Sequence, residues 1–359
     1  MSIGSASESL RDTVANAPLQ ARKTYSFQFT GTTGEYFKIW LSNLCLTVLT
    51  LGIYSAWAKV RREQYFHNHT VLNGHSFHYT ADPIKILKGR ILVLAIIIVF
   101  NIAPQLSPYA ALVVTATLLV VTPWLIVQAL RFRCRYTRYR NISFGFSGLP
   151  LQVAKYSMIY RTLALLTVIF FPLAKHREMR YYINNLSFGT SRFNFQGGAG
   201  DFYNIYIGCT LLFGSYAVMV YPMYLFFKPS APGFAGMSLL VLSLGGFLLA
   251  ATVFNMARVL VAKTLWNNTT VSVMQVHYDI AIGRYLWIYI SNFFLRLITF
   301  GLATPYCTVR LLRYKIECLS LVDRRAMGMH SFVAAKQEDR NAIGDQASDL
   351  LDMDIDLGF

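Results

Sequence analysis

Two arginines, Arg161 and Arg296, stand at near-equivalent places inside strongly apolar stretches of this 359-residue chain. A charge in hydrocarbon is costly, so such a residue faces a polar interior or extends its head to the membrane surface. Nearby serines and asparagines supply hydroxyl and amide partners. If the apolar stretches are broken helices of the kind that line transporters, these groups form a polar pathway. The candidate pathway residues are Arg161, Arg296, Ser42, Asn43, Ser291 and Asn292.

Basic side chains interleaved with aromatic ones form a second candidate site. Guanidinium groups bind phosphate, and aromatic rings favour headgroup depth, so we expect anionic lipid headgroups to bind here. An ordinary anchor on the positively charged side of the membrane is the alternative. The residues are Lys59, Arg61, Arg62, Arg131, Arg133, Arg135, Arg138, Arg140, Lys175, Arg177, Arg180, Arg310 and Arg313.

Histidines gather between residues 67 and 78. In a hairpin that turns on Asn73 and Gly74, His69 would pair across the strands with His78, and His67 would extend the same face. Three imidazoles on one face can hold Zn²⁺, Ni²⁺ or Cu²⁺. A solvated hairpin that is merely rich in histidine is the simpler alternative, and we expect no cofactor.

Composition indicates an integral membrane protein. Charged residues make up 14% of the chain and hydrophobic ones 55%, whereas soluble domains carry about 25% charged residues. The net charge of +16 is explained by lysines and arginines beside the membrane, so we expect no nucleic-acid partner. The common hydrolase, metalloprotease and nucleotide-binding motifs do not occur in the sequence, and nothing positive supports an enzyme.

The stretch 34–65 returns near the C-terminus as residues 283–314. Eleven of the 32 aligned positions are identical, far above chance, and residues 57–79 match residues 173–195 as well. The identical pairs are Gly34/Gly283, Tyr36/Tyr285, Ile39/Ile288, Ser42/Ser291, Asn43/Asn292, Leu46/Leu295, Thr50/Thr299, Gly52/Gly301, Val60/Val309, Arg61/Arg310 and Tyr65/Tyr314. The pattern predicts an architecture of repeated units.

We therefore predict an α-helical polytopic membrane protein with small cytoplasmic β elements and two and a half internal repeats. Each full unit holds a broken or re-entrant helix, an aromatic-basic extension, a β element and a transmembrane helical hairpin. The predicted parts are a disordered leader at 1–22, the first unit at 23–148, the second unit at 149–280, a third half-unit at 281–327 and an acidic disordered tail at 328–359.

Charge placement decides the predicted topology. Four full spans and three re-entrant helices put every basic cluster and both termini on the cytoplasmic side, whereas seven plain spans would place one basic cluster outside. The predicted spans are 84–104, 110–130, 202–227 and 237–257, and the re-entrant helices are 36–56, 153–172 and 284–304. We expect a hairpin at Thr70–Leu72 and His75–Tyr79, and N-caps at Asp82 and Asp201.

The string GEYFKIWLSNLCLTVLTLGIYSAWAKVRREQYF closely resembles the YjgN family of bacterial inner-membrane proteins. The pattern T-x-L-x-G-x-x-F-x-Y at 70–79 and ILKGR at 86–90 extend the resemblance, which covers roughly residues 24–320. It implies a multi-pass protein of a Gram-negative inner membrane. It carries over no catalytic or binding residue.

Two functional hypotheses follow. The first is a transporter or channel for a small solute or lipid, with a path lined by the broken helices. The second is a non-transporting membrane organiser that binds anionic lipid and recruits a protein partner through its β hairpins or acidic tail. A metal enzyme using the histidines is a weaker third, and the sequence leaves the oligomeric state open.

Overall fold

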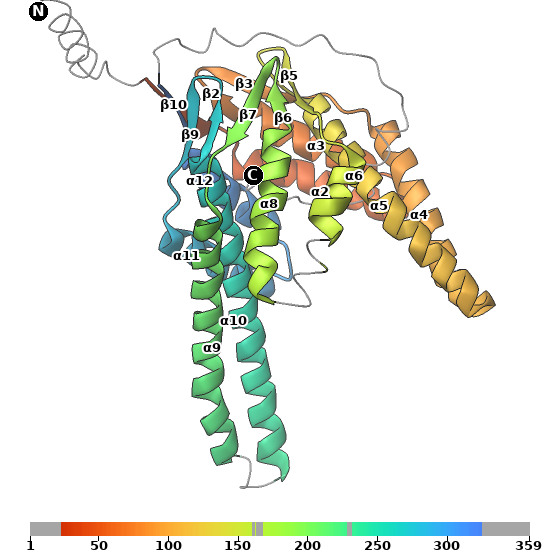
Figure 1. The fold of residues 1–359 in the computed structure, drawn as a ribbon, viewed down its shortest axis with the longest axis vertical. Helices are drawn as coiled ribbons and strands as arrows, with labels where there is room; N and C mark the ends of the chain where they lie inside the picture. The colour runs from red at the N-terminus through yellow and green to blue at the C-terminus, as the bar shows by residue number, and fades with distance from the viewer. Residues whose placement is uncertain (1–22, 160–161, 163–167, 228–231, 325–359) are drawn as a thin grey trace, which may run out of the picture.

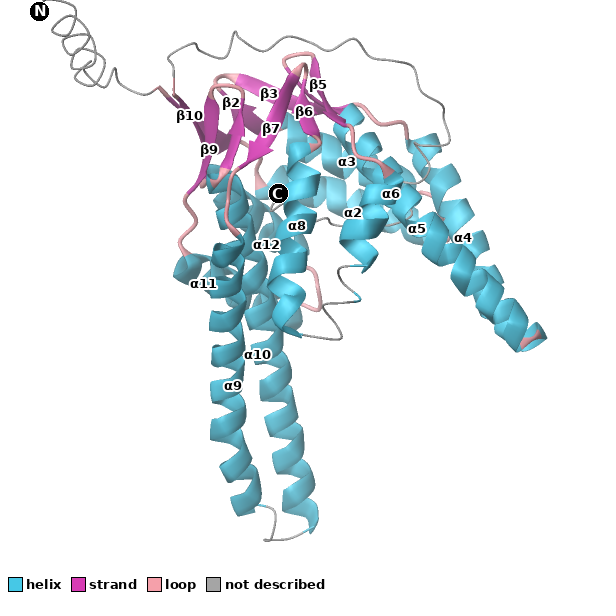
Figure 2. Ribbon diagram, in the orientation of Figure 1, coloured by secondary structure: helices cyan, strands magenta, loops and turns pink. Residues whose placement is uncertain are grey.

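Ten short strands form one closed antiparallel barrel at one end of the molecule (Figure 2). The structure is a computed structural model that describes residues 23–159, 162, 168–227 and 232–324. The strands are β1 (Thr24–Phe29), β2 (Thr70–Leu72), β3 (His75–Tyr79), β4 (Thr137–Tyr139), β5 (Ile142–Phe146), β6 (Leu186–Phe188), β7 (Ser191–Phe195), β8 (Thr269–Val271), β9 (Met274–Tyr278) and β10 (Leu319–Asp323).

Strands that follow one another along the chain are neighbours in the barrel, and β1 closes the ring. The first half of β1 pairs with β10, with Tyr25 opposite Leu321, and its second half pairs with β2, with Phe27 opposite Leu72. The predicted hairpin of β2 and β3 is confirmed. Its turn residues Asn73 and Gly74 have φ of 48° and 77°, as a tight two-residue hairpin requires.

The barrel overturns the predicted fold class. We expected a helical protein with small, separate β elements, and this was wrong, because strands from the whole described chain join into one sheet without an edge. Each strand has only three to six residues. A short strand leaves unpaired backbone groups on both sides, and closing the barrel satisfies them.

The helices lie at one end of the barrel, and five of them lead directly into a strand (Figure 1). Helices α3, α5, α8, α10 and α12 each end within two residues of the next strand. The elements are α2 (Thr33–Leu49), α3 (Ser55–Asn68), α4 (Pro83–Leu106), α5 (Pro108–Tyr136), α6 (Pro150–Val153), η1 (Ala154–Ile159), η2 (Val168–Phe170), α8 (Phe171–Asn184), α9 (Ala199–Phe227), α10 (Pro232–Asn267), α11 (Ile282–Ile298) and α12 (Thr304–Glu317).

Side chains fill the interior of the barrel. Tyr25, Leu72, Tyr139, Phe188 and Met274 form one buried cluster, and Phe188 lies 6.1 Å from Tyr139 between ring centres. The hydroxyl of Tyr139 donates to the carbonyl of Leu72 at 2.7 Å, so its polar end is satisfied. Burial of each large apolar side chain contributes about 1.5–3 kcal/mol. The barrel is a packed core that fixes the positions of the five helices below it.

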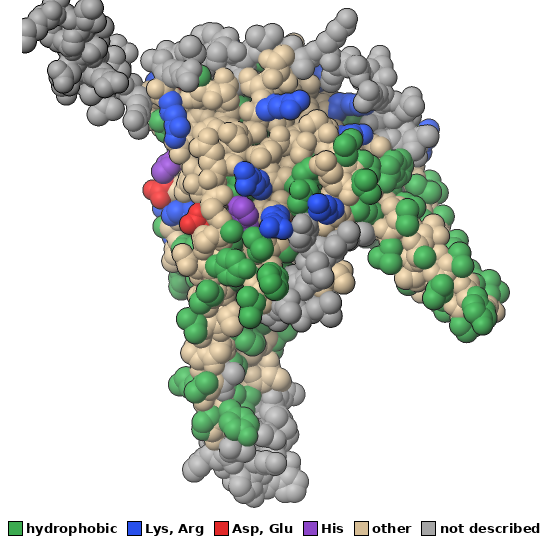
Figure 3. All heavy atoms as spheres, viewed as in Figure 1, with side chains coloured by type: hydrophobic (Ala, Val, Ile, Leu, Met, Phe, Trp, Pro, Cys, Tyr) green, Lys and Arg blue, Asp and Glu red, His purple; other side chains and the backbone are tan. Residues whose placement is uncertain are grey.

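Four helices of the described chain are long and apolar enough to cross a membrane. They fall at the predicted spans and form two arms, α4 with α5 and α9 with α10, covered by hydrophobic side chains (Figure 3). The candidate spans are Pro83–Leu106, Pro108–Tyr136, Ala199–Pro222 and Leu242–Asn267. The predicted N-cap at Asp82 is confirmed, since its carboxylate accepts from the Ile84 amide at 3.0 Å. Asp201 instead lies in the first turn of α9.

Candidate functional site

The asparagines of the predicted polar pathway hold two helical hairpins together. Asn43 on α2 donates from Nδ2 to the carbonyl of Ala58 on α3 at 3.3 Å. Asn292 on α11 makes the same contact with Cys307 on α12 at 3.1 Å. Both asparagines are buried. Each amide therefore joins the two helices of one hairpin side by side.

The other pathway residues lie beside these amides or apart from them. Ser291 and Asn292 accept from the guanidinium of Arg310 at 3.0 and 3.4 Å, and Ser42 bonds the carbonyl of Ile39 within its own helix. Arg296 is exposed in the last turn of α11. Arg161 lies outside the described residues, so the structure brings together only part of the predicted set.

The two helical hairpins turn on the same backbone conformation. Leu51 and Phe300 have φ of 50° and 49°, and the glycines that follow, Gly52 and Gly301, have φ of 92° and 87°. The amides of Gly52 and Gly301 each donate to a carbonyl five residues earlier at 2.8 Å, which closes the helix end. Leu51 is 95% exposed and Phe300 is 97% exposed. Each tip therefore presents an apolar side chain on a turn whose amides are paired.

The tips lie at a shallow depth relative to the long arms. Ser55 and Thr304, the first residues after the turns, each stand fifteen residues before their strand, about 22 Å along a helix. Arg90 on α4 donates to the hydroxyl of Ser55. The residues that follow Arg90 in α4 are uncharged and mostly apolar. The tip of the α2–α3 hairpin is thus level with the start of the apolar part of α4.

Basic residues recur at matched distances from the barrel on all five helices that enter it. We call this set the basic belt. Its members stand six, nine or eleven residues before the first residue of their strand, about 9–16 Å along a helix. At six residues are Arg131, Arg180, Lys263 and Arg313, at nine are Arg61, Arg177 and Arg310, and at eleven are Lys59, Lys175 and Arg258.

Several belt residues also fasten the barrel to the helices. Arg313 donates to the carbonyl of Gly31 at 2.7 Å, and Arg131 donates to the carbonyl of Gly148 at 3.0 Å. Lys263 donates to the carbonyl of Ile280 at 3.2 Å. Each of these carbonyls lies two residues after the end of a strand. The strand is β5 for the bond from α5, β9 for the bond from α10 and β1 for the bond from α12. An arginine has five N–H donors, so it can bond more than one partner at a time.

Sequence reasoning named most of the belt and missed two members. Arg258 and Lys263 on α10 were left out, although their spacing from β8 matches that of Lys175 and Arg180 from β6. Of the remaining predicted lipid-binding residues, Arg62, Arg133 and Arg135 lie on the same helices as the belt. Arg138 and Arg140 lie on β4 and in the turn after it, inside the barrel region.

The three candidate metal ligands do not converge. His67 bonds the carbonyl of Glu63 at 2.8 Å, while His69 lies at the end of α3 with Nδ1 on the carbonyl of Tyr65 at 2.7 Å. His78 bonds Asn68 at 3.1 Å and pairs with a residue of β4. His69 and His78 do not pair across the hairpin. Beyond Val71 and Ser76, strand β2 pairs with β1 and strand β3 pairs with β4. Within the described ranges no three His, Cys, Asp or Glu side chains form a metal-binding group.

Tyr65 connects α3 to the start of α2. Its hydroxyl donates to the carbonyl of Thr32 at 2.8 Å and approaches the carboxylate of Glu35 at 3.1 Å. Burial and the neighbouring Glu35 raise the pKa of Tyr65 to about 12. Hydrogen bonds from Thr32 and Tyr65 hold the pKa of Glu35 below its usual value. The hydroxyls of Tyr181 and Tyr314 likewise donate to the carbonyls of Leu149 and Ala281, at 3.4 and 3.0 Å.

Fold and site define a membrane protein in which one closed barrel gathers two apolar helical arms and a ring of basic residues. The chain belongs to the family described as "Bacterial protein of unknown function (DUF898)", which matches residues 24–350. This match, together with the relatives that carry the name YjgN, confirms the resemblance to the YjgN family.

Relatives named "Inner membrane protein YjgN" match part of this chain. The protein of Salmonella typhimurium is 30% identical over 158 residues, which is 40% of this chain and 40% of the relative. The protein of Escherichia coli strain K12 is 31% identical over 130 residues, 34% of this chain and 31% of the relative. The matched stretches thus span less than half of these relatives. No solved structure matches the chain.

Proposed function

We propose that this chain is an inner-membrane organiser whose basic belt binds anionic lipid headgroups. The two apolar arms would anchor it, with the barrel and both termini on the cytoplasmic side, where basic residues concentrate. The basic belt carries the proposal. Its ten residues come from five helices and fall within about 7 Å of one another in height, which is the thickness of a headgroup layer rather than of a whole span.

The short helical hairpins support the same placement. Ser55 and Thr304, the first helical residues after the tips, would lie about 6 Å below the lowest belt residues, because they stand four residues further from the barrel. Amphipathic helices at a membrane surface bury their apolar face by about 5–10 Å. We therefore propose that these hairpins, predicted as re-entrant, are shallow anchors in the near leaflet, repeated in the first and third units.

This placement favours the organiser over a transporter. A transporter needs polar groups that line a water-filled path across the membrane. Asn43 and Asn292 instead bond backbone carbonyls inside their hairpins, and Ser291 is bonded to Arg310. The barrel interior is filled with aromatic and aliphatic side chains. None of these groups is arranged to replace the hydration of a solute.

Binding of anionic lipid to purified protein tests the proposal. The test variant carries Arg177→Gln, Arg180→Gln and Arg258→Gln, three exposed belt residues on α8 and α10. Each basic residue near an anionic surface contributes about 1 kcal/mol, so the triple variant should bind phosphatidylglycerol about 100-fold more weakly. Affinity is measured in nanodiscs of neutral lipid titrated with phosphatidylglycerol, by quenching of a headgroup-labelled lipid.

The matched control is Arg192→Gln, which removes an exposed charge on β7. That variant should bind lipid as the unchanged protein does, because Arg192 lies beyond the reach of the headgroups. If the triple variant bound phosphatidylglycerol normally, the belt would be no lipid site. A loss of binding free energy per removed charge that is as large in the control as in the triple variant would show that only net charge matters, and the proposal would fail.

A further inference from the structure

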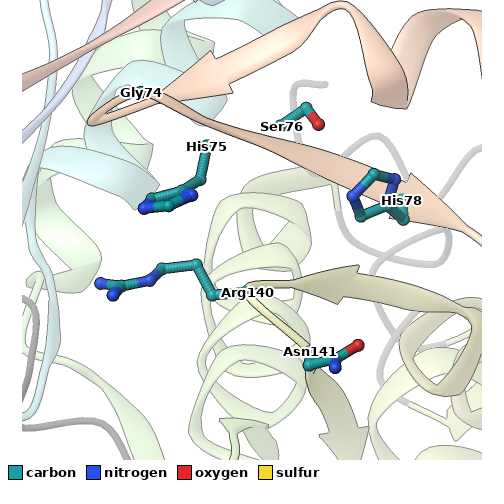
Figure 4. A pocket seen from close by; sticks show the side chains of 6 residues that line it. All are labelled: Gly74, His75, Ser76, His78, Arg140 and Asn141. Carbon is teal, nitrogen blue, oxygen red and sulfur yellow. The ribbon is translucent and has the colours of Figure 1, made fainter.

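A basic groove opens on the barrel surface near its free end, the end away from the helices. The groove has a volume of about 490 Å³ and is lined by Gly74, His75, Ser76, His78, Arg140 and Asn141. His75 and Arg140 extend their side chains toward the same side, and His78 lies further along β3 (Figure 4). His75 and Arg140 therefore meet an incoming group together from two neighbouring hairpins, whereas His78 is bonded to Asn68.

The membrane does not account for these bases. Strands rise about 3.3 Å per residue, so the turns at Gly74 and Arg140 lie roughly 10–17 Å beyond the point where the helices end. The basic belt lies a further 9 Å or more on the other side of that point. Both distances exceed the screening length of about 8 Å at physiological salt. The groove therefore fits an anionic partner other than the lipid surface.

The chain itself delivers acidic residues at this end. β10 runs from the helices toward the free end, where the amide of Arg324 donates to the carbonyl of Val273 in the β8–β9 turn at 3.2 Å. Arg324, the last described residue of the chain, therefore lies at the same end of the barrel as the groove. β10 and β3 are separated around the barrel only by β1 and β2. A gap of three strand spacings is about 15 Å.

The C-terminal sequence is acidic, so its charge is opposite in sign to that of the basic groove. Residues 338–356 hold seven acidic residues and one base, Arg340. In Asp352-Met-Asp-Ile-Asp356 every second residue is an aspartate, so in an extended chain all three carboxylates lie on one side, about 7 Å apart. A random chain of 25 residues, the number between Asp323 and Asp349, spans about 30 Å, so reach is not limiting.

We propose that the acidic segment 349–356 of the same chain docks in the basic groove of the barrel. Its aspartates face Arg140 and His75, and the short tether gives the segment a millimolar effective concentration. Docking covers the free end of the barrel and holds the segment's negative charge away from the anionic membrane. This surface is independent of the basic belt, so each proposal stands or fails without the other.

Photo-crosslinking in the full-length protein tests the docking. A benzoylphenylalanine replaces Ser76 inside the groove, and in a control it replaces Arg192 on β7. After illumination in nanodiscs, mass spectrometry locates the cross-linked peptide. We expect residue 76 to cross-link to residues 349–356 within one chain, and residue 192 to give at most a tenth of that yield.

Two perturbations sharpen the test. Arg140→Gln removes a charged hydrogen-bonding partner and should lower the yield from residue 76 about tenfold. Raising the salt concentration to about 1 M should lower it as well, because the Debye length falls to about 3 Å. Equal yields from residues 76 and 192, a yield insensitive to Arg140→Gln, or a product the size of two chains would each overturn the proposal.

Discussion

Replacement of Asn292 by alanine should open the α11–α12 hairpin more than the same change at Asn43 opens the α2–α3 hairpin. Asn292 is 3% exposed, donates to the Cys307 carbonyl and accepts from Arg310. Loss of a buried hydrogen bond with a charged partner costs about 1.5–3 kcal/mol. Asn43 makes a single 3.3 Å bond, and its Oδ1 is buried without a partner among the described residues. Asn43→Ala should therefore cost about 1 kcal/mol or less.

Cys307 supplies the assay, because its thiol is fully buried in the hairpin. In a variant whose other four cysteines are replaced by alanine, reaction with a fluorogenic maleimide during heating reports the opening of α11 from α12. Asn292→Ala should lower the midpoint by about 5 °C, at roughly 2–4 °C per kcal/mol. For Asn43→Ala the matching reporter is a buried cysteine at Ala56, which is 0% exposed on α3.

The contribution of Arg310 is separated by a double-mutant cycle. If the Arg310 contact makes the difference, Arg310→Gln and Asn292→Ala should be non-additive by at least about 0.5 kcal/mol. Equal midpoint shifts for the two asparagine variants, or fully additive effects in the cycle, would refute the reasoning.

Two further predictions concern the turn at Gly301 and the contact between Tyr65 and Glu35. Gly301→Ala places a Cβ at φ of 87° and should destabilise the hairpin by about 1–2 kcal/mol. Gly283→Ala places its Cβ in open space and should leave the stability unchanged. The thermal midpoints of the two variants measure the difference. Bonds from Thr32 and Tyr65 lower the pKa of Glu35, so the unfolded chain binds the proton more readily. The stability that this contact contributes is therefore present above about pH 4.5 and is lost as the pH falls. Tyr65→Phe should flatten that part of the profile of stability against pH. An unchanged profile would exclude a contribution from the contact.

The sequence predicted local features well where neighbouring residues decide them. The hairpin at Asn73 and Gly74 followed from turn chemistry, and the cap at Asp82 followed from the proline after it. The four long apolar helices followed from hydrophobic length. Each of these rests on contacts within a few residues, which a single sequence displays.

The barrel was missed because its strands are short and its pairings are distant. β1 pairs with β10 across nearly three hundred residues, and β5 pairs with β6 across about forty. A three-residue strand has no periodicity that sets it apart from a turn. The same reason explains the candidate site. Asn43 and Asn292 were read as polar groups facing a pathway, because the sequence does not show that Ala58 and Cys307 lie beside them.

By itself the sequence determined that the chain is a membrane protein, where its long apolar helices lie and which of its residues are basic, because composition and hydrophobic length act locally. Only the tertiary structure decided that five helices enter one barrel at a common level, since this depends on hydrogen bonds between distant strands. That common level turns scattered residues such as Lys59, Lys175 and Arg258 into a belt. It also sets the basic groove and Arg324, the last described residue before the acidic sequence, at the same end of the barrel.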